Sequence, residues 1–511
     1  MTGVQTCALP IYWVLAQRDI EILDGAVDWT DELRGAPTLK LRQVGLHLVN
    51  RGTRHRFGLK AVPPVEIAGA LDVRGDFTGR SLKNPADWKG RIYMDLPHAN
   101  IAAWRTYAPL PIEINRGEGA LRAWAEVADL TPLEGIADVT LAQVRARLNK
   151  SLPELDLSSL SGRVGWRRSD GRMAFFTRGL TLVTQGDLRL PATDFQYVEL
   201  AAVKHRPASG SLKANVLDIV PLASIADHLP IEPAQRARLL ALAPKGKLTG
   251  VALTWEGAWP APEKYQAQAR FEQLAINRTE EFAGLSGITG RIEATEKGGT
   301  MQLDAAATKL DLPQVFKSVL VFDTLKGEAR WKRTQPGFEL KLANVRYANA
   351  DLAGELQGSY KHVPGQPGIA DFSGALTRAD ARQAVRYLPL PAARNARPWL
   401  EGAFLAGSSD DVKFRLKGDL RHFPFVEERD GIFTISAKVK GATVHYGDNW
   451  PNIERIDGDL LFRGRRMEIS ASQGFSMGAR LSGVRAEIAD LAQQRLLTVA
   501  GDAEEIGRAH V

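Results

Sequence analysis

Residues 433–440 read Phe-Thr-Ile-Ser-Ala-Lys-Val-Lys, so an apolar side chain alternates with a polar one along the whole stretch. Because successive side chains of a β-strand point to opposite faces, this period of two predicts a strand with one apolar and one polar face. The pattern recurs in Val-Lys-Phe-Arg-Leu-Lys at 412–417 and in Phe-Glu-Leu-Lys-Leu at 338–342. It also occurs in residues 121–127, 301–307 and 467–471. Repeated strands of this kind are typical of an antiparallel sheet that is dry on one face and wet on the other.

Turn residues separate the predicted strands. Arg-Ser-Asp-Gly at 168–171, Glu-Lys-Gly-Gly at 296–299 and Gln-Pro-Gly at 335–337 each stand between two alternating arms, which predicts β-hairpins. A short unit recurs at the opening of several hairpins: Leu-Ser-Gly at 160–162 and 285–287, Leu-Lys-Gly at 325–327 and Ile-Asp-Gly at 456–458. Repetition of a small β unit favours a stacked β architecture.

Three segments break the alternation and are predicted to be helical. They are residues 219–243, residues 378–403 and a shorter piece near 101–107. Pro233 and Pro398 stand where a helix can begin, because the first turn of a helix does not need the amide hydrogen that proline lacks. We interpret these segments as interruptions that cap or bridge the sheet.

A sheet that is apolar on one face along its whole length must close, pair with a second sheet or hold apolar ligands. A series of globular sandwiches would need a boundary about every 100 residues, yet no linker rich in proline, glycine and serine divides the chain. The predicted fold is mainly β: an elongated, twisted antiparallel β-groove, folded over on itself, built of repeated hairpins and interrupted or capped by a few short helices. Its predicted segments are 12–218 (first part of the groove), 219–243 (helical insertion), 244–377 (middle part), 378–403 (helical insertion) and 404–504 (last part).

The two ends of the chain do not resemble natural protein. MTGVQTCALPI at 1–11 and EIGRAHV at 505–511 match the translation of a sequencing adapter. We therefore expect neither end to be native and interpret the chain as an internal piece of a longer protein. The single cysteine, Cys7, falls in the first stretch, so no disulfide or cysteine-containing metal site is expected in the rest.

Composition excludes several classes of protein. Hydrophobic residues make up 44% of the chain and charged residues 24%, which excludes a disordered protein. The longest apolar runs are shorter than the ~20 residues that cross a bilayer. The net charge of +7 is spread along the chain, with small clusters such as Arg163, Arg167 and Arg168 at expected turns. Because no basic strip with interleaved aromatic residues is found, we predict no nucleic-acid partner.

Residue types that perform catalysis do not occur in the required spacing. The histidines never stand in His-x-x-x-His or His-Glu-x-x-His order, so no metal site is predicted. Ser158-Ser159 and Ser408-Ser409 lack a nucleophile elbow. Asp410-Asp411 and Glu427-Glu428 are interpreted as solvated loop charges. Since no phosphate-binding glycine loop is found either, we predict neither an enzyme nor a cofactor.

Residues 399–491 carry motifs that resemble a known family. The motifs are Trp-Leu at 399–400, Phe-Arg-Leu-Lys-Gly-Asp-Leu at 414–420, Phe-Pro-Phe at 423–425, Gly-x-Phe-x-Ile at 431–435, Trp-Pro-x-Ile at 450–453 and Ile-x-Gly-x-Leu-x-Phe at 456–462, followed by Met467, Gly474 and Gly478. This block closely resembles the YhdP-type branch of the AsmA-like bacterial envelope proteins. Earlier stretches resemble the same branch, so the resemblance covers nearly all of residues 12–504: Gly25 to Trp29, Pro63-Pro64, Trp88-Lys-Gly and Leu152 to Gly162.

The resemblance implies a protein anchored in the inner membrane of a Gram-negative bacterium, with a periplasmic β-groove that moves phospholipids toward the outer membrane. The partners that it implies are phospholipids, the two membranes and envelope proteins of unknown identity. Acyl chains are expected to slide passively along the inward apolar face. The expected inward residues are Phe338, Leu340, Leu342, Val412, Phe414, Leu416, Phe433, Ile435, Val439, Met467 and Ile469.

Two other functions stay open at this point. An AsmA-like scaffold that helps outer-membrane proteins to assemble, or that maintains the envelope, would have the same fold. A glycan-binding β module would instead stack sugars on exposed aromatic rings. The candidate rings are those of Trp255, Trp259, Trp331, Trp399 and Trp450.

Overall fold

The computed structural model describes residues 17–32, 35–80, 87–107, 113–129, 131–229, 232–280, 282–390, 397–447, 449–491 and 494–505. Residues 1–11, with Cys7, and residues 506–511 lie outside these ranges, so the prediction that the ends are not native falls on residues that are not described. The chain divides into two compact units. The first unit comprises Met1–Leu240 and Lys247–Gln266, and the second comprises Ala241–Gly246 and Ala267–Val511.

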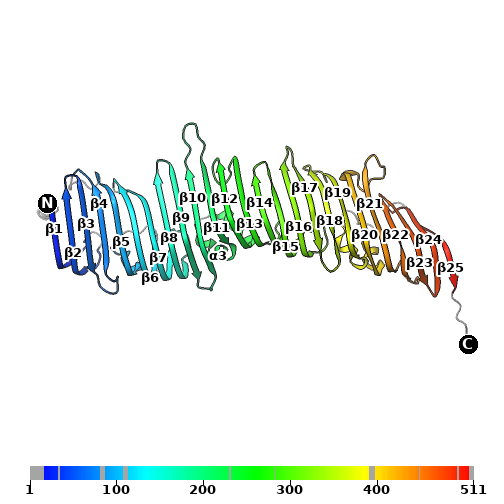
Figure 1. The fold of residues 1–511 in the computed structure, drawn as a ribbon, viewed down its shortest axis with the longest axis horizontal. Coiled ribbons are helices and arrows are strands. Elements are labelled where there is room, and N and C mark those ends of the chain that lie inside the picture. The colour runs from blue at the N-terminus through cyan, green and yellow to red at the C-terminus, as the bar shows by residue number, and fades with distance from the viewer. Residues whose placement is uncertain are drawn as a thin grey trace, which may run out of the picture. The chain divides into compact units, whose positions relative to one another are not determined.

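The first unit is a run of antiparallel strands in chain order (Figure 1). Each strand pairs with the next one, from β1 with β2 to β11 with β12. The bounds are β1 Asp19–Trp29, β2 Leu39–Arg51, β3 Arg54–Val62, β4 Leu71–Thr78, β5 Lys89–Asn100, β6 Glu113–Ala128, β7 Thr131–Arg147, β8 Leu155–Ser169, β9 Arg172–Thr184, β10 Arg189–Leu200, β11 Ser209–Asp218 and β12 Lys245–Glu256.

The second unit follows the same plan. From β14 to β25, each strand again pairs antiparallel with the next. The bounds are β13 Lys264–Ile276, β14 Gly284–Thr295, β15 Gly298–Asp311, β16 Leu320–Arg333, β17 Phe338–Ala348, β18 Leu352–His362, β19 Ile369–Asp380, β20 Phe404–Asp419, β21 Gly431–Val444, β22 Ile453–Arg463, β23 Arg466–Ser476, β24 Ala479–Asp490 and β25 Gln494–Glu505. Within each unit the described strand pairings are all antiparallel and make one sheet. The predicted mainly-β fold of repeated antiparallel hairpins is confirmed.

Several strands contain one residue in the left-handed backbone region. Gln43 in β2 (φ 51°), Asn344 in β17 (φ 52°) and Arg455 in β22 (φ 52°) are examples, and the pairing register shifts beside each of them. An extra residue of this kind bends the strand and shifts its side-chain alternation by one position. As a result, Leu342 and Val345 point to the same face although they are three residues apart.

The recurring glycine unit of the sequence marks these bulges. Gly162, Gly287 and Gly327 lie inside β8, β14 and β16, a few residues away from the hairpin turns. A Cβ on Gly287 would lie 2.6 Å from the carbonyl oxygen of Ala307, which itself has a φ of 54°. The alternation predicted for residues 301–307 therefore ends at Ala307, because its left-handed backbone changes the face to which the following side chain points.

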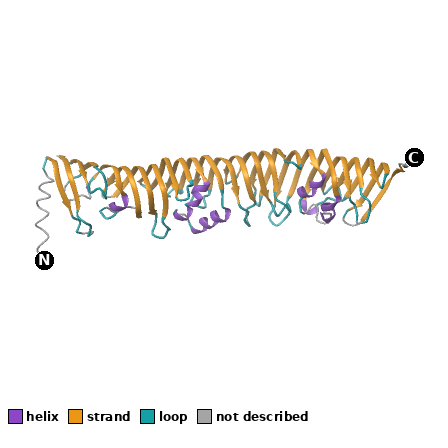
Figure 2. Cartoon of the chain, turned by 90° about the horizontal axis from the view of Figure 1, so that it is seen from below, coloured by secondary structure: helices purple, strands orange, loops and turns teal. Residues whose placement is uncertain are grey.

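The helices are short, and within each unit they lie on one side of the sheet (Figure 2). Those of the first unit and its border are α2 Ile101–Trp104, α3 Ile219–Ser224, η2 Ala226–His228 and α4 Pro233–Leu242. Those of the second unit are η3 Ala381–Tyr387, α5 Arg397–Ala403 and η4 Leu420–His422. Helices thus begin at Pro233 and beside Pro398, as predicted. Within the described ranges, no helix combines the length and the apolar character that crossing a bilayer requires.

Buried apolar side chains gather on one face of the sheet in each unit. The first unit has the larger cluster, formed by Val44, Ala61, Ala68, Leu71, Leu96, Ala99, Ile101, Leu141, Val144, Ala146, Leu157, Leu182, Leu190 and Ile225. The second unit has a smaller one, formed by Leu320, Phe322, Leu325 and Leu352. In the first unit the helical segments pack on this face, because Ile101 of α2 and Ile225, between α3 and η2, belong to the cluster. In the second unit Tyr387 of η3 packs against the smaller cluster.

Candidate functional site

One face of the first unit is apolar from its first strand to its last. Residues that pair directly across an antiparallel ladder point to the same face, so the register defines rows that cross the strands. One row, here called the first row, takes one residue from each strand and contains no charged side chain. It consists of Ile20, Leu48, Phe57, Gly75, Ile92, Ala125, Gly135, Trp166, Phe175, Tyr197, Leu212 and Leu253.

The neighbouring row on the same face is equally apolar. It consists of Ile22, Leu46, Leu59, Val73, Met94, Ala123, Ala137, Val164, Thr177, Phe195, Ala214 and Val251. Its one polar side chain is buried, and the hydroxyl of Thr177 donates to the carbonyl oxygen of Thr193 at 3.0 Å. The same hydroxyl accepts from the amide of Phe195 at 3.1 Å, so no unpaired polar group interrupts the face here.

The second unit has a row of the same kind, here called the second row. It takes one residue from each strand from β15 to β25, and all of them are apolar, glycine or tyrosine. It consists of Ala305, Leu325, Tyr347, Gly354, Leu376, Val412, Ala437, Leu460, Ile469, Ala486 and Val499.

The structure places all the predicted inward residues on this face of the second unit. Val412 and Ile469 belong to the second row itself. Phe414, Ile435 and Met467 lie in the row beside it, with Phe462 between the last two. Leu342, Leu416 and Phe433 occupy the row after that, and Phe338, Leu340 and Val439 extend the same alternation along their strands. Met467 is buried, whereas Phe338 keeps 39% of its surface exposed, so burial differs within the set.

The opposite face of the second unit is charged. Its side chains form ion pairs between neighbouring strands, such as Lys326 with Asp304 at 2.9 Å and Lys440 with Asp410 at 2.6 Å. Ser436, which follows Ile435, pairs across the ladder with Lys413 and so points to this face. A water-facing surface of this kind is expected behind a sheet whose other face is apolar.

In the first unit the helical segments cover part of the apolar face. Ile101 in α2 and Ile225 beside η2 are buried in the cluster of strand residues. Trp104, Leu222 and Leu229 pack against the same cluster. Trp166 and Phe175 of the first row nevertheless keep 37% and 41% of their surfaces exposed, so the cover is incomplete.

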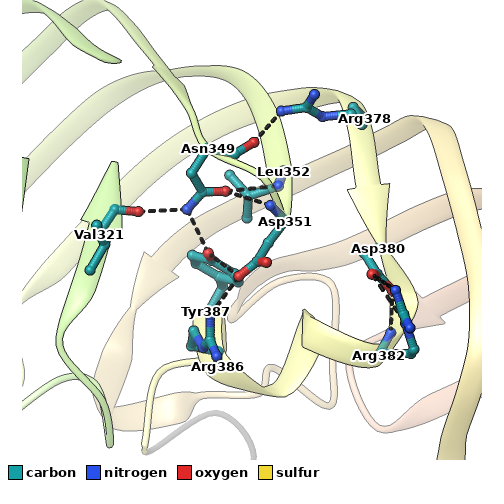
Figure 3. Close-up of polar contacts among 9 residues, drawn as sticks. All are labelled: Val321, Asn349, Asp351, Leu352, Arg378, Asp380, Arg382, Arg386 and Tyr387. Carbon is teal, nitrogen blue, oxygen red and sulfur yellow. Dashed lines mark hydrogen bonds and ion pairs between the residues drawn. The ribbon is translucent and has the colours of Figure 1, made fainter. Parts of the chain in front are cut away.

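In the second unit an asparagine fixes the loop between β17 and β18 (Figure 3). The Nδ2 of Asn349 donates to the carbonyl oxygen of Val321 at 2.6 Å and to the hydroxyl of Tyr387 at 2.7 Å. Its Oδ1 accepts from the amides of Asp351 and Leu352, each at 2.9 Å. This buried side chain therefore joins three separate stretches of the unit.

Tyr387 is the link between that loop and the η3 segment (Figure 3). Its hydroxyl donates to Oδ2 of Asp351 at 2.8 Å, and the same carboxylate oxygen pairs with Arg386 at 2.7 Å. Its ring packs against the buried cluster of the second unit together with Phe316. Burial raises the pKa of the Tyr387 hydroxyl, so the group stays a neutral donor. The η3 segment is held over the apolar face by these contacts.

An Asp-x-Arg clamp begins two of the 3-10 segments. Ahead of η3, the carboxylate of Asp380 accepts a hydrogen bond from the amide of Arg382 at 3.0 Å. The guanidinium of Arg382 binds the same carboxylate (Figure 3). Asp419 does the same with Arg421 ahead of η4, at 3.0 Å. The side-chain hydrogen bond from Arg421 lowers the pKa of Asp419 to about 2.

The other residues considered from the sequence do not assemble into a reactive site. Asp410 and Asp411 lie near lysine side chains, Lys440 and Lys413 respectively. In the described ranges, no three His, Cys, Asp or Glu side chains come together as metal ligands would.

The tryptophans considered for glycan binding are spread over both units. Trp255 is buried, and its ring lies 5.3 Å from that of the exposed Trp259. Trp399 and Trp450 are exposed and pack on Phe404 and Tyr446 respectively. The ring of Trp331 lies over Gly299. Glycan stacking stays a prediction for the exposed rings of Trp259, Trp399 and Trp450.

Two comparisons relate the sequence to one family. A family model described as YhdP protein matches residues 8–510. The chain is similar to the intermembrane phospholipid transporter YhdP of Escherichia coli (strain K12), with 23% identity over 258 residues. The aligned part is 50% of this chain and 20% of the relative, so the chain spans much less than the relative's length. No solved structure matches the chain.

Proposed function

The chain belongs to the YhdP protein family, and on this premise we propose that its apolar face holds the acyl chains of phospholipids and lets them pass between two membranes. The similar protein of Escherichia coli is named an intermembrane phospholipid transporter. The observation that carries the proposal is the unbroken apolar character of the first and second rows. Neither row contains a charged residue at any of its strands.

An apolar path is what a phospholipid needs in water. Exposing two acyl chains with roughly 30 methylenes costs on the order of 20 kcal/mol, at about 0.8 kcal/mol for each methylene. Along a row, an acyl chain meets the next apolar side chain after roughly 4.8 Å, the distance between neighbouring strands. The lipid therefore keeps its apolar contacts while it moves, and the movement needs no chemical step.

The polar groups of the lipid stay in water in this proposal. The headgroup remains outside the groove, and the charged opposite face of the sheet is solvated. We place the chain in the periplasm of a Gram-negative cell, attached to the inner membrane through other parts of the protein. The similar protein is about five times as long as the part that aligns, and this leaves room for such parts.

The prediction that the chain is not an enzyme agrees with the family. The related protein is named as a transporter. Some of the residues weighed in the sequence make structural contacts: His445 lies 3.0 Å from Oδ1 of Asn452, and Asp410 forms an ion pair with Lys440 at 2.6 Å.

Two adjacent substitutions test the proposal. Ile435→Glu places a charge on the apolar face, and Ser436→Glu places the same charge on the opposite face of the same strand. Each variant and the parent chain are purified from the periplasm of a Gram-negative host, and the bound phospholipid is counted by native mass spectrometry. We expect several phospholipids on the parent and on Ser436→Glu, and a loss of at least half of them on Ile435→Glu. A parent chain free of lipid would refute the proposal and favour the scaffold function.

A further inference from the structure

Aromatic rings on the apolar face lie over glycines of the neighbouring strand. Gly135 in β7 is paired across the ladder with Trp166 in β8, and a Cβ on this glycine would lie 2.6 Å from the indole Nε1. Real Cβ atoms essentially never come within 3.0 Å of another group. The three nearest atoms all belong to the Trp166 ring, so the ring occupies the place that a side chain of residue 135 would take.

The same arrangement recurs across both units. Gly75 lies under the ring of Phe57, and Gly210 lies under the ring of Trp255, each with its cross-strand partner. In the second unit, Gly374 lies under the ring of Phe414. In each case a Cβ on the glycine would approach the ring more closely than 3.0 Å. The arrangement is therefore a repeated feature of the apolar face.

A ring over a glycine has a particular orientation. Side chains of a strand normally stand roughly perpendicular to the sheet. Because glycine has no Cβ, the neighbouring ring can lean across and rest on the backbone of the next strand. It then covers the sheet as a thin layer and does not project from it. An alanine in place of the glycine forces the ring to rise.

We propose that these glycines set the depth of the lipid path, because each one keeps an aromatic ring flat on the floor of the groove. The inference rests on the proposed function, since a floor matters only if acyl chains lie on it. Trp166 is the most informative position, because it lies in the first row and keeps 37% of its surface exposed. Raising this ring would narrow the path at one strand while the rest of the row stays unchanged.

The chain provides a matched control on the opposite face. Gly165 in β8 pairs with Phe176 in β9, and a Cβ there would also come within 3.0 Å of the ring. Gly165 precedes Trp166, so the Phe176 ring lies on the opposite face. Gly165→Ala therefore raises a ring by the same steric effect, but away from the proposed lipid path.

The experiment compares Gly135→Ala, Gly165→Ala and the double variant Gly135→Ala/Trp166→Ala with the parent chain. Phospholipid bound per chain is measured by native mass spectrometry after purification from a Gram-negative periplasm, and thermal unfolding followed by circular dichroism shows that each variant is folded. We expect Gly135→Ala to hold at most half as much phospholipid as the parent. Gly165→Ala should hold the parental amount, and removal of the indole should restore binding in the double variant.

The outcomes separate this inference from the proposed function. If the parent binds phospholipid and Gly135→Ala binds as much, the glycines do not set the depth and the inference is wrong. Equal losses in Gly135→Ala and Gly165→Ala, or no recovery in the double variant, would also overturn it, because the loss would then come from general destabilisation. A parent chain without lipid overturns both the proposed function and the inference.

Discussion

The hydroxyl of Tyr387 offers a test of how firmly the η3 segment is held over the apolar face. Tyr387→Phe removes this hydroxyl and keeps the ring, which packs against the cluster around Phe322. The variant loses the hydrogen bond to Asp351 at 2.8 Å and the one from Asn349 at 2.7 Å. The carboxylate of Asp351 keeps its ion pair with Arg386 at 2.7 Å, so no unpaired charge is left behind.

The expected magnitude follows from these contacts. A typical hydrogen bond contributes about 0.5–1.5 kcal/mol to stability, so the loss of both should cost about 1–3 kcal/mol. Because the bonds join η3 to the loop between β17 and β18, the cost should appear as easier local opening of residues 381–387. Amide hydrogen exchange in this segment should accelerate by roughly 5- to 150-fold, since each 1.4 kcal/mol is about tenfold.

Hydrogen exchange with mass spectrometry measures this effect directly. Tyr360→Phe is the matched control, because the Tyr360 hydroxyl donates at 2.9 Å to the carbonyl oxygen of Pro367 in a loop of the same unit. The control should leave exchange in residues 381–387 at the parental rate. Unchanged exchange there in Tyr387→Phe would show that ring packing alone holds the segment, and equal acceleration in both variants would show that the effect is not local.

Three further predictions concern stability. The pKa of Asp419 is lowered to about 2, so its carboxylate stabilises the folded chain above the ordinary pKa of 3.8, and this stabilisation is lost as the pH falls toward about 2. The difference in thermal midpoint between the parent and Asp419→Asn should therefore be constant well above pH 3.8 and disappear near pH 2. Ala307→Val should lower the free energy of unfolding by about 1–2 kcal/mol, because a β-branched residue is strained at a φ of 54°. Ala306→Val, at the neighbouring exposed position, should have little effect. Urea unfolding would show whether the two variants differ in stability. Leu157→Ala should lower the free energy of unfolding by about 2–5 kcal/mol, since Leu157 is only 2% exposed. A loss of less than about 1 kcal/mol in the same assay would resemble a surface substitution and would mean that the cluster around Leu157 is not tightly packed.

The strands and hairpins could be predicted from the sequence because each depends on nearby residues. The alternation at 433–440 lies within β21, and the turn at 168–171 joins β8 to β9. Period-two alternation also fixes which residues share a face within one strand, and the pairing of Phe414 with Ile435 shows that the apolar sets of β20 and β21 lie on the same face. The proline at position 233 marked the beginning of α4 for a similarly local reason.

The bulges could not be predicted, because their cause lies between strands. Nothing in the residues around Gln43 or Arg455 announces a left-handed backbone, and neither residue type favours it. The recurring Leu-Ser-Gly unit was a signal, but its meaning depends on the neighbouring strand, which approaches Gly162 within 2.7 Å of a would-be Cβ. The contacts of Asn349 and Tyr387 were missed for the same reason, since 38 residues separate the two.

The glycines show most clearly why a single strand contains too little information. In β7 the position of Gly135 looks like a gap in the apolar alternation, because glycine has no side chain to pack and is disfavoured in strands. Its partner Trp166 fills that gap from the next strand, so the apolar surface is complete only when the pair is considered together. At such a pair, the ring on one strand fills the space above the glycine of the next strand. A search for similar faces in other sequences should accordingly accept glycine in an apolar row wherever an aromatic residue stands at the paired position of the adjoining strand.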